Sequence, residues 1–289
     1  MFAGCSTALI TPFKDDGTVD EETFRRLIDF QEENGVDTIV PCGSTGESAT
    51  LSAEEHVKVI GIAVDQVKRA KVLAGAGSNS TAEAISFSKH AEDMGADGVL
   101  SISPYYNKPT QEGIYLHYKS IAEATEIPIV VYNVPGRTGS NITSETMLRM
   151  AEIPGIAAVK EASGNISQVQ RILAGRPRGF EVISGDDALT YPIMAMGGDG
   201  VISVTGNCCP ARMSKMVHLM QESKFSEALE ICNELVPLFN ALFSEPNPIP
   251  IKYAMKELGF GNGVPRLPLT PLSEAGRKTL APILKELGL

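Results

Sequence analysis

Short runs of apolar and β-branched residues recur along the chain, and the stretches between them have the hydrophobic spacing of helices. Asp20–Gln31, for example, places Phe24, Leu27 and Ile28 on one helical face. Eight runs are predicted to be strands: Thr7–Ile10, Thr38–Val40, Val72–Ala74, Val99–Ile102, Ile129–Val131, Ala157–Val159, Val182–Ile183 and Val201–Val204. They recur about every 28 residues, which is the length of one strand–helix unit.

Three of the predicted strands follow similar segments, Gly35–Val40, Gly95–Leu100 and Gly197–Ile202. Each segment begins with a glycine placed to end the preceding helix, and its apolar pair opens a strand. Repeated units with strands apolar on both faces indicate an α/β protein whose parallel sheet is covered by helices. Eight such units favour a closed (β/α)8 TIM barrel, and an open doubly wound sheet is the alternative.

The strand signal stops after about residue 222. Three helical patterns follow, at Lys224–Phe243, Ile251–Leu258 and Ser273–Leu287, and proline-rich connectors separate them. We therefore predict a catalytic (β/α)8 barrel at residues 1–222 and a C-terminal helical extension at residues 223–289.

Composition and charge narrow the classes of partner. Lys and Arg number 25 against 35 Asp and Glu, a net charge of −10, which argues against nucleic acid because a phosphate backbone needs clustered positive charge. The five cysteines lack metal or redox spacing and fit reduced thiols in the cytoplasm. Ala3-Gly4-Cys5 resembles the end of a lipoprotein signal, but no basic or apolar segment accompanies it, so no secretion signal is predicted. No apolar run is long enough to predict a membrane span.

The sharpest candidate for chemistry is Lys160, which directly continues the run Ala157–Val159. Active sites of (β/α)8 barrels lie at the C-terminal ends of the strands. Burial there lowers the pKa of an amine, and a neutral amine is a nucleophile for a carbonyl. The alternative is a lysine paired with Glu161 or another acid. Tyr132 ends the neighbouring strand, where its phenol can transfer protons, unless it is an ordinary core tyrosine.

Two loops at the same end of the barrel are suited to binding carboxylates. Gly43–Glu47 offers backbone N–H groups with the hydroxyls of Ser44 and Thr45, and its alternative is a tight turn that caps the next helix. Arg137 lies in the glycine-flanked loop Pro135–Gly139 and can bind a carboxylate through two parallel hydrogen bonds. The alternative is a solvated loop arginine, which the loop favours when it is considered without the other groups.

Phosphate, metal and dinucleotide sites are not predicted. The loop Gly185–Asp187 carries two carboxylates that would repel phosphate, and Gly197–Gly200 precedes its strand, at the wrong end of a barrel. No dinucleotide fingerprint opens the chain. Four histidines lack metal-ligand spacing and are expected on helix surfaces: His56, His90, His117 and His218.

The strand-end motifs resemble those of the pyruvate-dependent class I aldolase and N-acetylneuraminate lyase family of (β/α)8 enzymes, over essentially the whole chain. The motifs are Gly43-Ser-Thr-Gly-Glu47, Ser103-Pro-Tyr-Tyr-Asn107, Tyr132-Asn-Val-Pro-Gly-Arg137, Val159-Lys-Glu161, Ser184-Gly-Asp186, Asn247-Pro-Ile-Pro-Ile-Lys252 and Arg266-Leu-Pro-Leu269. N-acetylneuraminate lyases share the Ser-Thr loop, the tyrosine and the lysine but lack the arginine. The presence of Arg137 therefore makes the chain more similar to the branch of this family whose members act in lysine biosynthesis.

This resemblance implies a lyase that condenses pyruvate with L-aspartate-4-semialdehyde in the diaminopimelate route to lysine. Lys160 would form a Schiff base with pyruvate. Thr45, Tyr132 and Tyr106 would form a proton relay, with Tyr106 donated by a neighbouring subunit. No cofactor or metal is implied.

The resemblance also assigns substrate contacts. Arg137 would bind the carboxylate of the semialdehyde, Ser44 and Thr45 would contact substrate, and Gly185 and Ile202 would line the pocket through their backbones. Ser44 departs from the Thr-Thr pair that relatives often have, but it keeps the hydroxyl.

Assembly and regulation are implied in the same way. The chain would form a homotetramer, a dimer of dimers. A lysine feedback site would map onto Ala49, His56, Gly77, Asn79, Glu83 and Tyr105. Many lysine-sensitive relatives have a second histidine where this chain has Ala53, so the potency of lysine is left open.

Two other functions remain open. Another pyruvate-dependent aldolase would act on a sugar acid or 2-keto acid, and Arg137 argues against it. A non-catalytic sensor of a keto acid or of lysine would not need Lys160, Tyr132 and Thr45 together.

Overall fold

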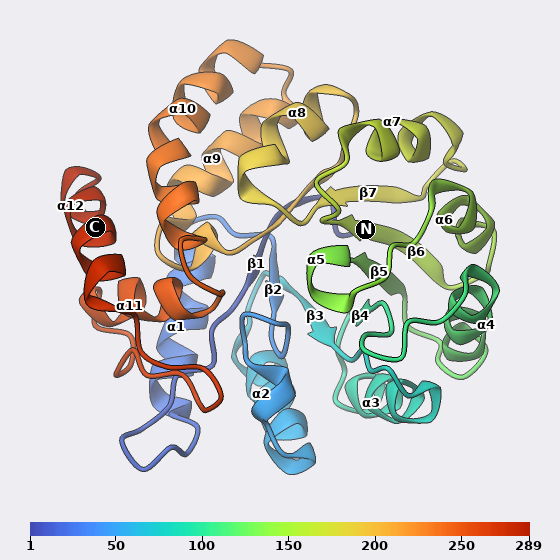
Figure 1. Ribbon diagram of the computed structural model, residues 1–289, viewed down its shortest axis with the longest axis horizontal. Helices are drawn as coiled ribbons and strands as arrows, with labels where there is room; N and C mark the ends of the chain where they lie inside the picture. The colour runs from blue at the N-terminus through green and yellow to red at the C-terminus, as the bar shows by residue number, and fades with distance from the viewer.

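A closed barrel of eight parallel strands forms the centre of the computed structural model, which describes residues 1–289 (Figure 1). The strands are β1 Gly4–Ala8, β2 Thr38–Val40, β3 Lys71–Gly75, β4 Gly98–Ile102, β5 Ile129–Asn133, β6 Ile156–Glu161, β7 Glu181–Ser184 and β8 Gly200–Ser203. The prediction of a (β/α)8 barrel is confirmed, and the open-sheet alternative is wrong because β1 pairs with β8.

The predicted first strand is displaced by a few residues. β1 comprises Gly4–Ala8 rather than Thr7–Ile10, and Ser6 and Thr7 pair with Ile202 and Ser203 of β8. Small and polar residues such as Gly4 and Ser6 fit where strands approach closely, but they carry no apolar signal. The hydrophobic pattern therefore marked only the end of this strand.

Helices alternate with the strands and surround them. They are α1 Glu21–Glu33, α2 Ala53–Gln66, α3 Thr81–Asp93, α4 Gln111–Ala122, α5 Pro135–Thr138, α6 Ser144–Ala151, α7 Ile166–Gly175, α8 Thr190–Ala195, α9 Pro210–Gln221, α10 Phe225–Leu242, α11 Ile249–Glu257 and α12 Glu274–Glu286. The expected start signals are present, since Asp20 caps α1 and Ser52 forms a capping box with Glu55 at α2. Gly35 and Gly95, predicted to end helices, have left-handed φ values of 84° and 87°.

The apolar residues form two layers. An outer cluster of 62 buried residues lies between the strands and the helices, and an inner cluster of 11 fills the barrel. The inner cluster includes Phe2, Leu73, Val130 and Ile183. Because these side chains fill the interior, the barrel is a packed core rather than a pore, and the active sites of such barrels lie at the C-terminal ends of the strands.

The C-terminal helices pack against the barrel on the side of α1 and α9 (Figure 1). Leu235 and Leu238 of α10 belong to the same core cluster as Val217 of α9. The boundary between residues 222 and 223 stays a prediction. Across it, α9 and α10 share one apolar core.

Two histidines differ from the expected helix-surface position. His56 and His117 lie on helices as predicted, but both are buried. His56 Nε2 lies 2.8 Å from the carbonyl oxygen of Gly75, and its ring stacks on Phe87. Burial lowers the pKa of His117 to about 4, which keeps that ring neutral at physiological pH. No helix of the structure has the length and hydropathy needed to cross a membrane.

The shared core predicts that the tail and the barrel stabilise each other. We expect Leu235→Ala to lower the free energy of unfolding by about 2–5 kcal/mol, because Leu235 is fully buried. Denaturant unfolding followed by circular dichroism measures this. Val236→Ala is the control, since Val236 is 41% exposed and its loss should cost less than about 0.5 kcal/mol. Equal effects of the two substitutions would contradict the shared core.

Candidate active site

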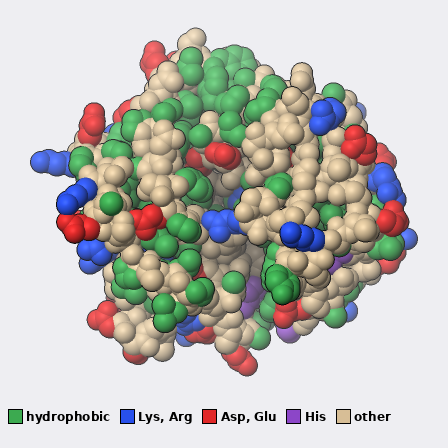
Figure 2. All heavy atoms as spheres, viewed as in Figure 1, with side chains coloured by type: hydrophobic (Ala, Val, Ile, Leu, Met, Phe, Trp, Pro, Cys, Tyr) green, Lys and Arg blue, Asp and Glu red, His purple; other side chains and the backbone are tan.

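A cavity of about 440 Å³ opens at the C-terminal ends of the strands. Figure 2 shows the hollow in this face of the molecule, with side chains of Lys or Arg at its edge. The lining residues come from the barrel loops and from the tail: Ala8, Gly43, Ser44, Thr45, Leu100, Tyr132, Val134, Arg137, Lys160, Ala162, Gly185, Asp186, Ala188, Val204, Phe239, Asn240, Phe243 and Asn247. The cavity is large enough for small carboxylic acids.

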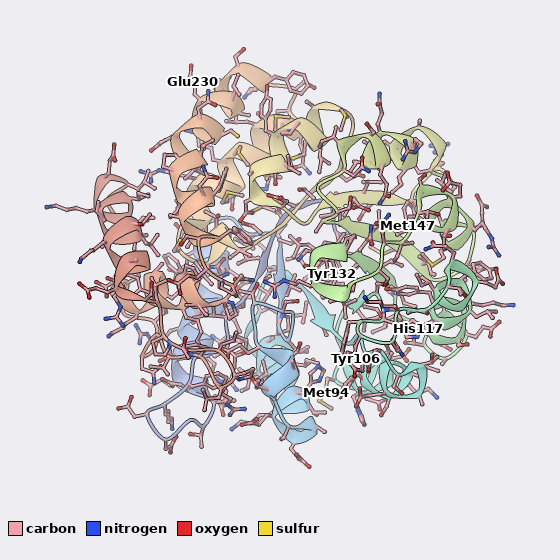
Figure 3. The ribbon with its side chains drawn as sticks, viewed as in Figure 1. Met94, Tyr106, His117, Tyr132, Met147 and Glu230 are labelled. Carbon is pink, nitrogen blue, oxygen red and sulfur yellow. The ribbon has the colours of Figure 1, made fainter.

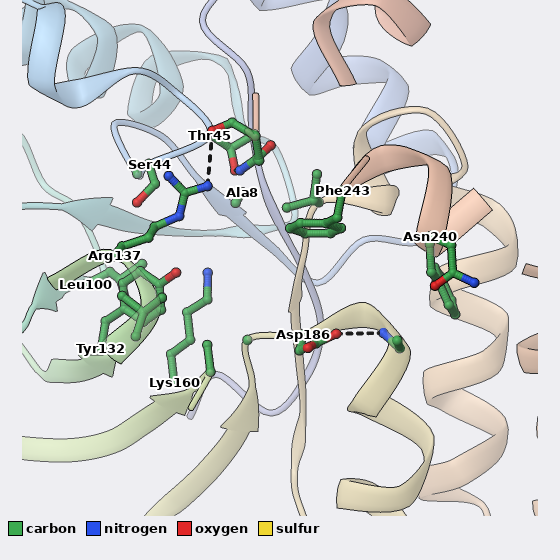
Figure 4. Close-up of a pocket in the computed structure, with 18 residues that line it drawn as sticks. Ala8, Ser44, Thr45, Leu100, Tyr132, Arg137, Lys160, Asp186, Asn240 and Phe243 are labelled. Atoms are coloured by element: carbon green, nitrogen blue, oxygen red, sulfur yellow. Dashed lines mark hydrogen bonds between the residues drawn. The ribbon is translucent and has the colours of Figure 1, made fainter. Parts of the chain in front are cut away.

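Lys160 extends from β6 into this cavity (Figure 4). It is only 5% exposed, and burial lowers the pKa of its amine to about 7, an effect that Arg137 adds to and the carboxylate of Asp187 opposes. A large fraction of the amine is therefore neutral near physiological pH. The side chain has the position and the protonation state of a nucleophile.

The alternative of a Lys160–Glu161 ion pair is wrong. Successive residues of a strand point to opposite faces, so Glu161 points away from the cavity. Its carboxylate accepts hydrogen bonds from Ser163 N at 2.8 Å and from Asn133 Nδ2 at 3.1 Å. Glu161 thus organises the outer side of the strand ends and leaves the lysine unpaired.

Tyr132 lies directly beside Lys160, because the two residues are register partners on β5 and β6. The lysine Nζ is 4.3 Å from the centroid of the tyrosine ring. Burial raises the pKa of Tyr132 to about 12, against the opposing influence of Arg137 and the Ser44 hydroxyl. The phenol therefore stays protonated and can donate a proton to a group bound at Lys160.

Gly185 leaves the space that the lysine side chain occupies. A Cβ atom at this position would lie 3.0 Å from Lys160 Cε and 2.7 Å from Ala162 Cβ. The side chain could not keep its present path next to such an atom. The glycine of the Ser184-Gly-Asp186 motif is therefore needed for close packing.

The loop Gly43–Glu47 brings Ser44 and Thr45 to the cavity wall as predicted. Thr45 is buried, and its Oγ1 accepts a hydrogen bond of 2.9 Å from Asn247 Nδ2. Arg137 reaches over the cavity, where its Nη2 donates to the carbonyl oxygen of Asn247 at 3.1 Å (Figure 4). Two predicted substrate-binding residues thus meet at one residue of the tail.

The tail contributes residues to the cavity wall that were not predicted from the sequence. Asn247 follows a proline in a connector and lies about 200 positions from the loop it contacts. Phe239, Asn240 and Phe243 belong to α10, whose apolar spacing indicates only helix packing. The Asn-Pro-Ile-Pro motif was the one available signal.

Two other predicted residues do not line this cavity. Tyr106 is 88% exposed on the loop after β4, with a left-handed φ of 69° (Figure 3). The chain by itself does not bring its hydroxyl to Lys160. Ile202 is buried inside the barrel, below Val204, which does line the cavity.

The predicted lysine site lies outside the cavity, on the segments that follow β2, β3 and β4, including His56 of α2 and Glu83 of α3. Asn79 Nδ2 donates to the carbonyl oxygen of Tyr105 at 3.2 Å, and the Ser78 hydroxyl donates to Glu83. His56 is buried and Ala49 lies in a short 3₁₀ turn at Ser48–Thr50. Gly77 packs against the backbone of Ile102, where a side chain would collide.

The fold and the cavity define a class of enzyme. A (β/α)8 barrel with a desolvated lysine at the end of β6 and a protonated tyrosine beside it is suited to forming a Schiff base with a carbonyl substrate. No group of three or more His, Cys, Asp or Glu residues is arranged to hold a metal ion. The class is therefore that of the lysine-dependent lyases and aldolases.

Comparison with known proteins identifies the family. Residues 1–287 match the Dihydrodipicolinate synthetase family. A 4-hydroxy-tetrahydrodipicolinate synthase of Chloroherpeton thalassium is 52% identical over 99% of this chain and 96% of its own length. This chain belongs to the dihydrodipicolinate synthetase family, and its enzymes are lyases.

Solved structures agree with this assignment. The dihydrodipicolinate synthase of Aquifex aeolicus is 46% identical and superposes with a TM-score of 0.98, covering 100% of this chain and 99% of that one. The chloride-inhibited enzyme of Acinetobacter baumannii, solved in complex with pyruvate, is 44% identical with a TM-score of 0.98 and the same coverage.

The close approach at Gly185 gives a direct test of the site. We expect Gly185→Ala to displace Lys160 and to slow its trapping by pyruvate and borohydride on the order of 100-fold, the effect of a misplacement of about 1 Å. Mass spectrometry of the adduct measures the rate. Gly61→Ala on α2 is the control, because its added Cβ meets only Met94 Sδ at an ordinary 3.6 Å. A variant with the trapping rate of the unmodified protein would contradict the packing argument.

Proposed function

We propose that this chain is a 4-hydroxy-tetrahydrodipicolinate synthase, which condenses pyruvate with L-aspartate-4-semialdehyde in the diaminopimelate route to lysine. The observation that carries the proposal is the buried Lys160 beside Tyr132, in a cavity that also holds Arg137 and the loop Gly43–Glu47. Relatives with this name are about half identical to the chain over almost its full length.

The reaction begins at Lys160. The neutral amine attacks the keto carbon of pyruvate and forms a carbinolamine, which loses water to give the imine. The protonated Tyr132 supplies a proton to the departing hydroxyl. The hydroxyl that acts on Tyr132 is that of Ser44, so Ser44, in place of the expected Thr45, is suited to relay this proton. The backbone N–H groups and hydroxyls of Ser44 and Thr45 hold the pyruvate carboxylate.

The second substrate enters above the imine. Arg137, which reaches over the cavity, binds the carboxylate of the semialdehyde. The imine loses a methyl proton to become an enamine, whose carbon attacks the aldehyde. The amino group of the semialdehyde then attacks the imine carbon, closes the ring and releases Lys160.

Tyr106 completes the proton relay from a neighbouring subunit in this proposal. Tyr106 is 88% exposed and does not line the cavity of its own chain, which fits a residue that acts in another copy's site. Because Tyr106 would act in a neighbouring subunit, we also propose a homotetramer built as a dimer of dimers. Lysine is proposed as a feedback inhibitor that binds near Asn79 and Tyr105.

The proposed location is the cytoplasm. All five cysteines are free and buried. Burial raises the pKa of the Cys5 thiol to about 12, which keeps it protonated and unreactive. Reduced thiols of this kind fit a reducing compartment.

An aldolase for another 2-keto acid or a sugar acid is the second candidate, because it would use the same lysine and tyrosine. A carboxylate clamp such as Arg137 suits a short second substrate with its own acid group. A sensor without catalysis is disfavoured because the lysine is desolvated and unpaired, and binding alone would not require either property.

Borohydride reduction in the presence of pyruvate, followed by peptide mapping, tests the proposed chemistry. We expect one pyruvate-derived adduct, on the peptide that contains Lys160, and none in Lys160→Met. An unmodified Lys160 would exclude the Schiff-base mechanism. A coupled assay with aspartate semialdehyde then tests the substrate. Turnover with a sugar-derived aldehyde, but none with the semialdehyde, would favour the second candidate.

A further inference from the structure

A second lysine is buried outside the chemistry described above. Lys252 of α11 is 1% exposed, and its Nζ donates to Glu47 Oε1 at 2.5 Å. Most lysines of the chain can reach water, but this one is enclosed together with its carboxylate partner. Glu47 is the last residue of the loop that carries Ser44 and Thr45, so the ion pair joins the tail to the active-site loop.

Further hydrogen bonds hold both ends of this pair. Glu47 Oε2 accepts from the backbone N–H of Arg266 at 2.8 Å, and Lys252 Nζ also donates to the carbonyl oxygen of Thr11 at 3.1 Å. The Thr11 hydroxyl in turn donates to the carbonyl oxygen of Gly46 at 2.7 Å. The loop is therefore attached to the tail through Glu47 and through Thr11.

An aromatic ring shields the pair from solvent. Lys252 Nζ is 4.0 Å from the ring centroid of Phe13, and the guanidinium of Arg266 is 4.3 Å from the same centroid. Glu55 neutralises Arg266 through an ion pair of 2.5 Å. In such an enclosed place, the loss of one member of the pair leaves a charge that water cannot reach.

The Glu47–Lys252 pair is not explained by its contribution to the free energy of unfolding. Burying two charges costs about as much desolvation energy as their attraction returns, and apolar residues of similar volume often serve as well. Glu47 has a φ of 56°, a left-handed conformation that glycine would adopt without strain. A left-handed backbone at a non-glycine residue costs energy, and the buried ion pair of Glu47 holds the residue in that conformation. Such an arrangement is expected where the backbone of a loop must be held in one position.

The ion pair acts on the loop that carries Thr45, two residues before Glu47. The Thr45 hydroxyl accepts the hydrogen bond from Asn247, five positions before Lys252 on the same tail segment. Because a hydroxyl has one hydrogen, an oxygen that accepts from Asn247 has its own hydrogen free to donate into the cavity. The tail thereby sets both the place of Thr45 and the direction of its hydrogen.

We propose that Glu47 and Lys252 are positioning residues, which hold the Ser44–Thr45 loop so that the Thr45 hydroxyl donates into the cavity. This inference rests on the proposed function, since the Thr45 hydroxyl helps there to hold the pyruvate carboxylate. It assigns a role to the two tail motifs, Asn247–Lys252 and Arg266–Leu269, that the reaction itself leaves unused.

Lys252→Met tests the proposal. The substitution keeps much of the volume but removes the charge. In protein shown to be folded by circular dichroism, we expect kcat with pyruvate and aspartate semialdehyde to fall on the order of 10- to 100-fold. Trapping at Lys160 should still reach completion at saturating pyruvate, because the side chains of Glu47 and Lys252 bond to each other, Thr11 and Arg266 and not to β6. Lys278→Met is the matched control, since it removes an exposed ion pair with Glu274 on α12 and should leave kcat unchanged.

The double variant Glu47→Gln with Lys252→Met separates positioning from folding. It leaves no unpaired buried charge, so its thermal midpoint should recover toward that of the unmodified protein, while kcat stays low. The double variant also provides the kcat measurement if Lys252→Met alone does not fold. Recovery of kcat together with the thermal midpoint, or an unchanged kcat in folded Lys252→Met, would overturn the proposal.

Failure of the proposed function is recognised separately. In that case the unmodified protein itself would not turn over aspartate semialdehyde. The initial rate of borohydride trapping with pyruvate alone would then be compared between the double variant and the unmodified protein. A severalfold slower rate in the variant would support the positioning role, and equal rates would contradict it.

Discussion

An ammonium group that is enclosed by protein loses most of its hydration, and Lys160 is enclosed on β6 without a directly paired acid. The resulting fall of its pKa to about 7 is the constraint on which the chemistry depends. An ion pair would keep the amine protonated and inert toward a carbonyl. The neighbouring acid, Glu161, faces away and is satisfied by Asn133 and Ser163. The alternation of a β-strand thus separates the nucleophile from the carboxylate next to it.

The same desolvation acts on the groups around the lysine with different results. Tyr132 becomes harder to ionise and so remains a proton donor, whereas the amine becomes easier to deprotonate. Gly185 provides room for the lysine, and the tail closes the cavity with Phe239, Phe243 and Asn247. The tail therefore lines the candidate active site as well as belonging to the shared core.

The periodic pattern sufficed to predict the barrel and the residues at its strand ends. The end of a strand can be recognised from the local sequence, and it is also the place where side chains enter the cavity. Lys160 and Tyr132 were found in this way. Contacts between distant segments have no such signal. The Asn247–Thr45 hydrogen bond and the Glu47–Lys252 pair each join positions about 200 residues apart, and neither segment alone indicates which distant residue it contacts. His56 and His117 were misplaced for the same reason, since their burial depends on neighbouring helices and loops.

The most direct measurement is the pH dependence of imine formation at Lys160. The initial rate of borohydride trapping with saturating pyruvate would be followed by mass spectrometry across the neutral range. Because the protonated amine cannot attack a carbonyl, the rate should fall as the pH drops through the pKa, with a midpoint at about 7. A midpoint near 10.5, the ordinary value for lysine, would show that the amine is solvated or paired and would contradict the account.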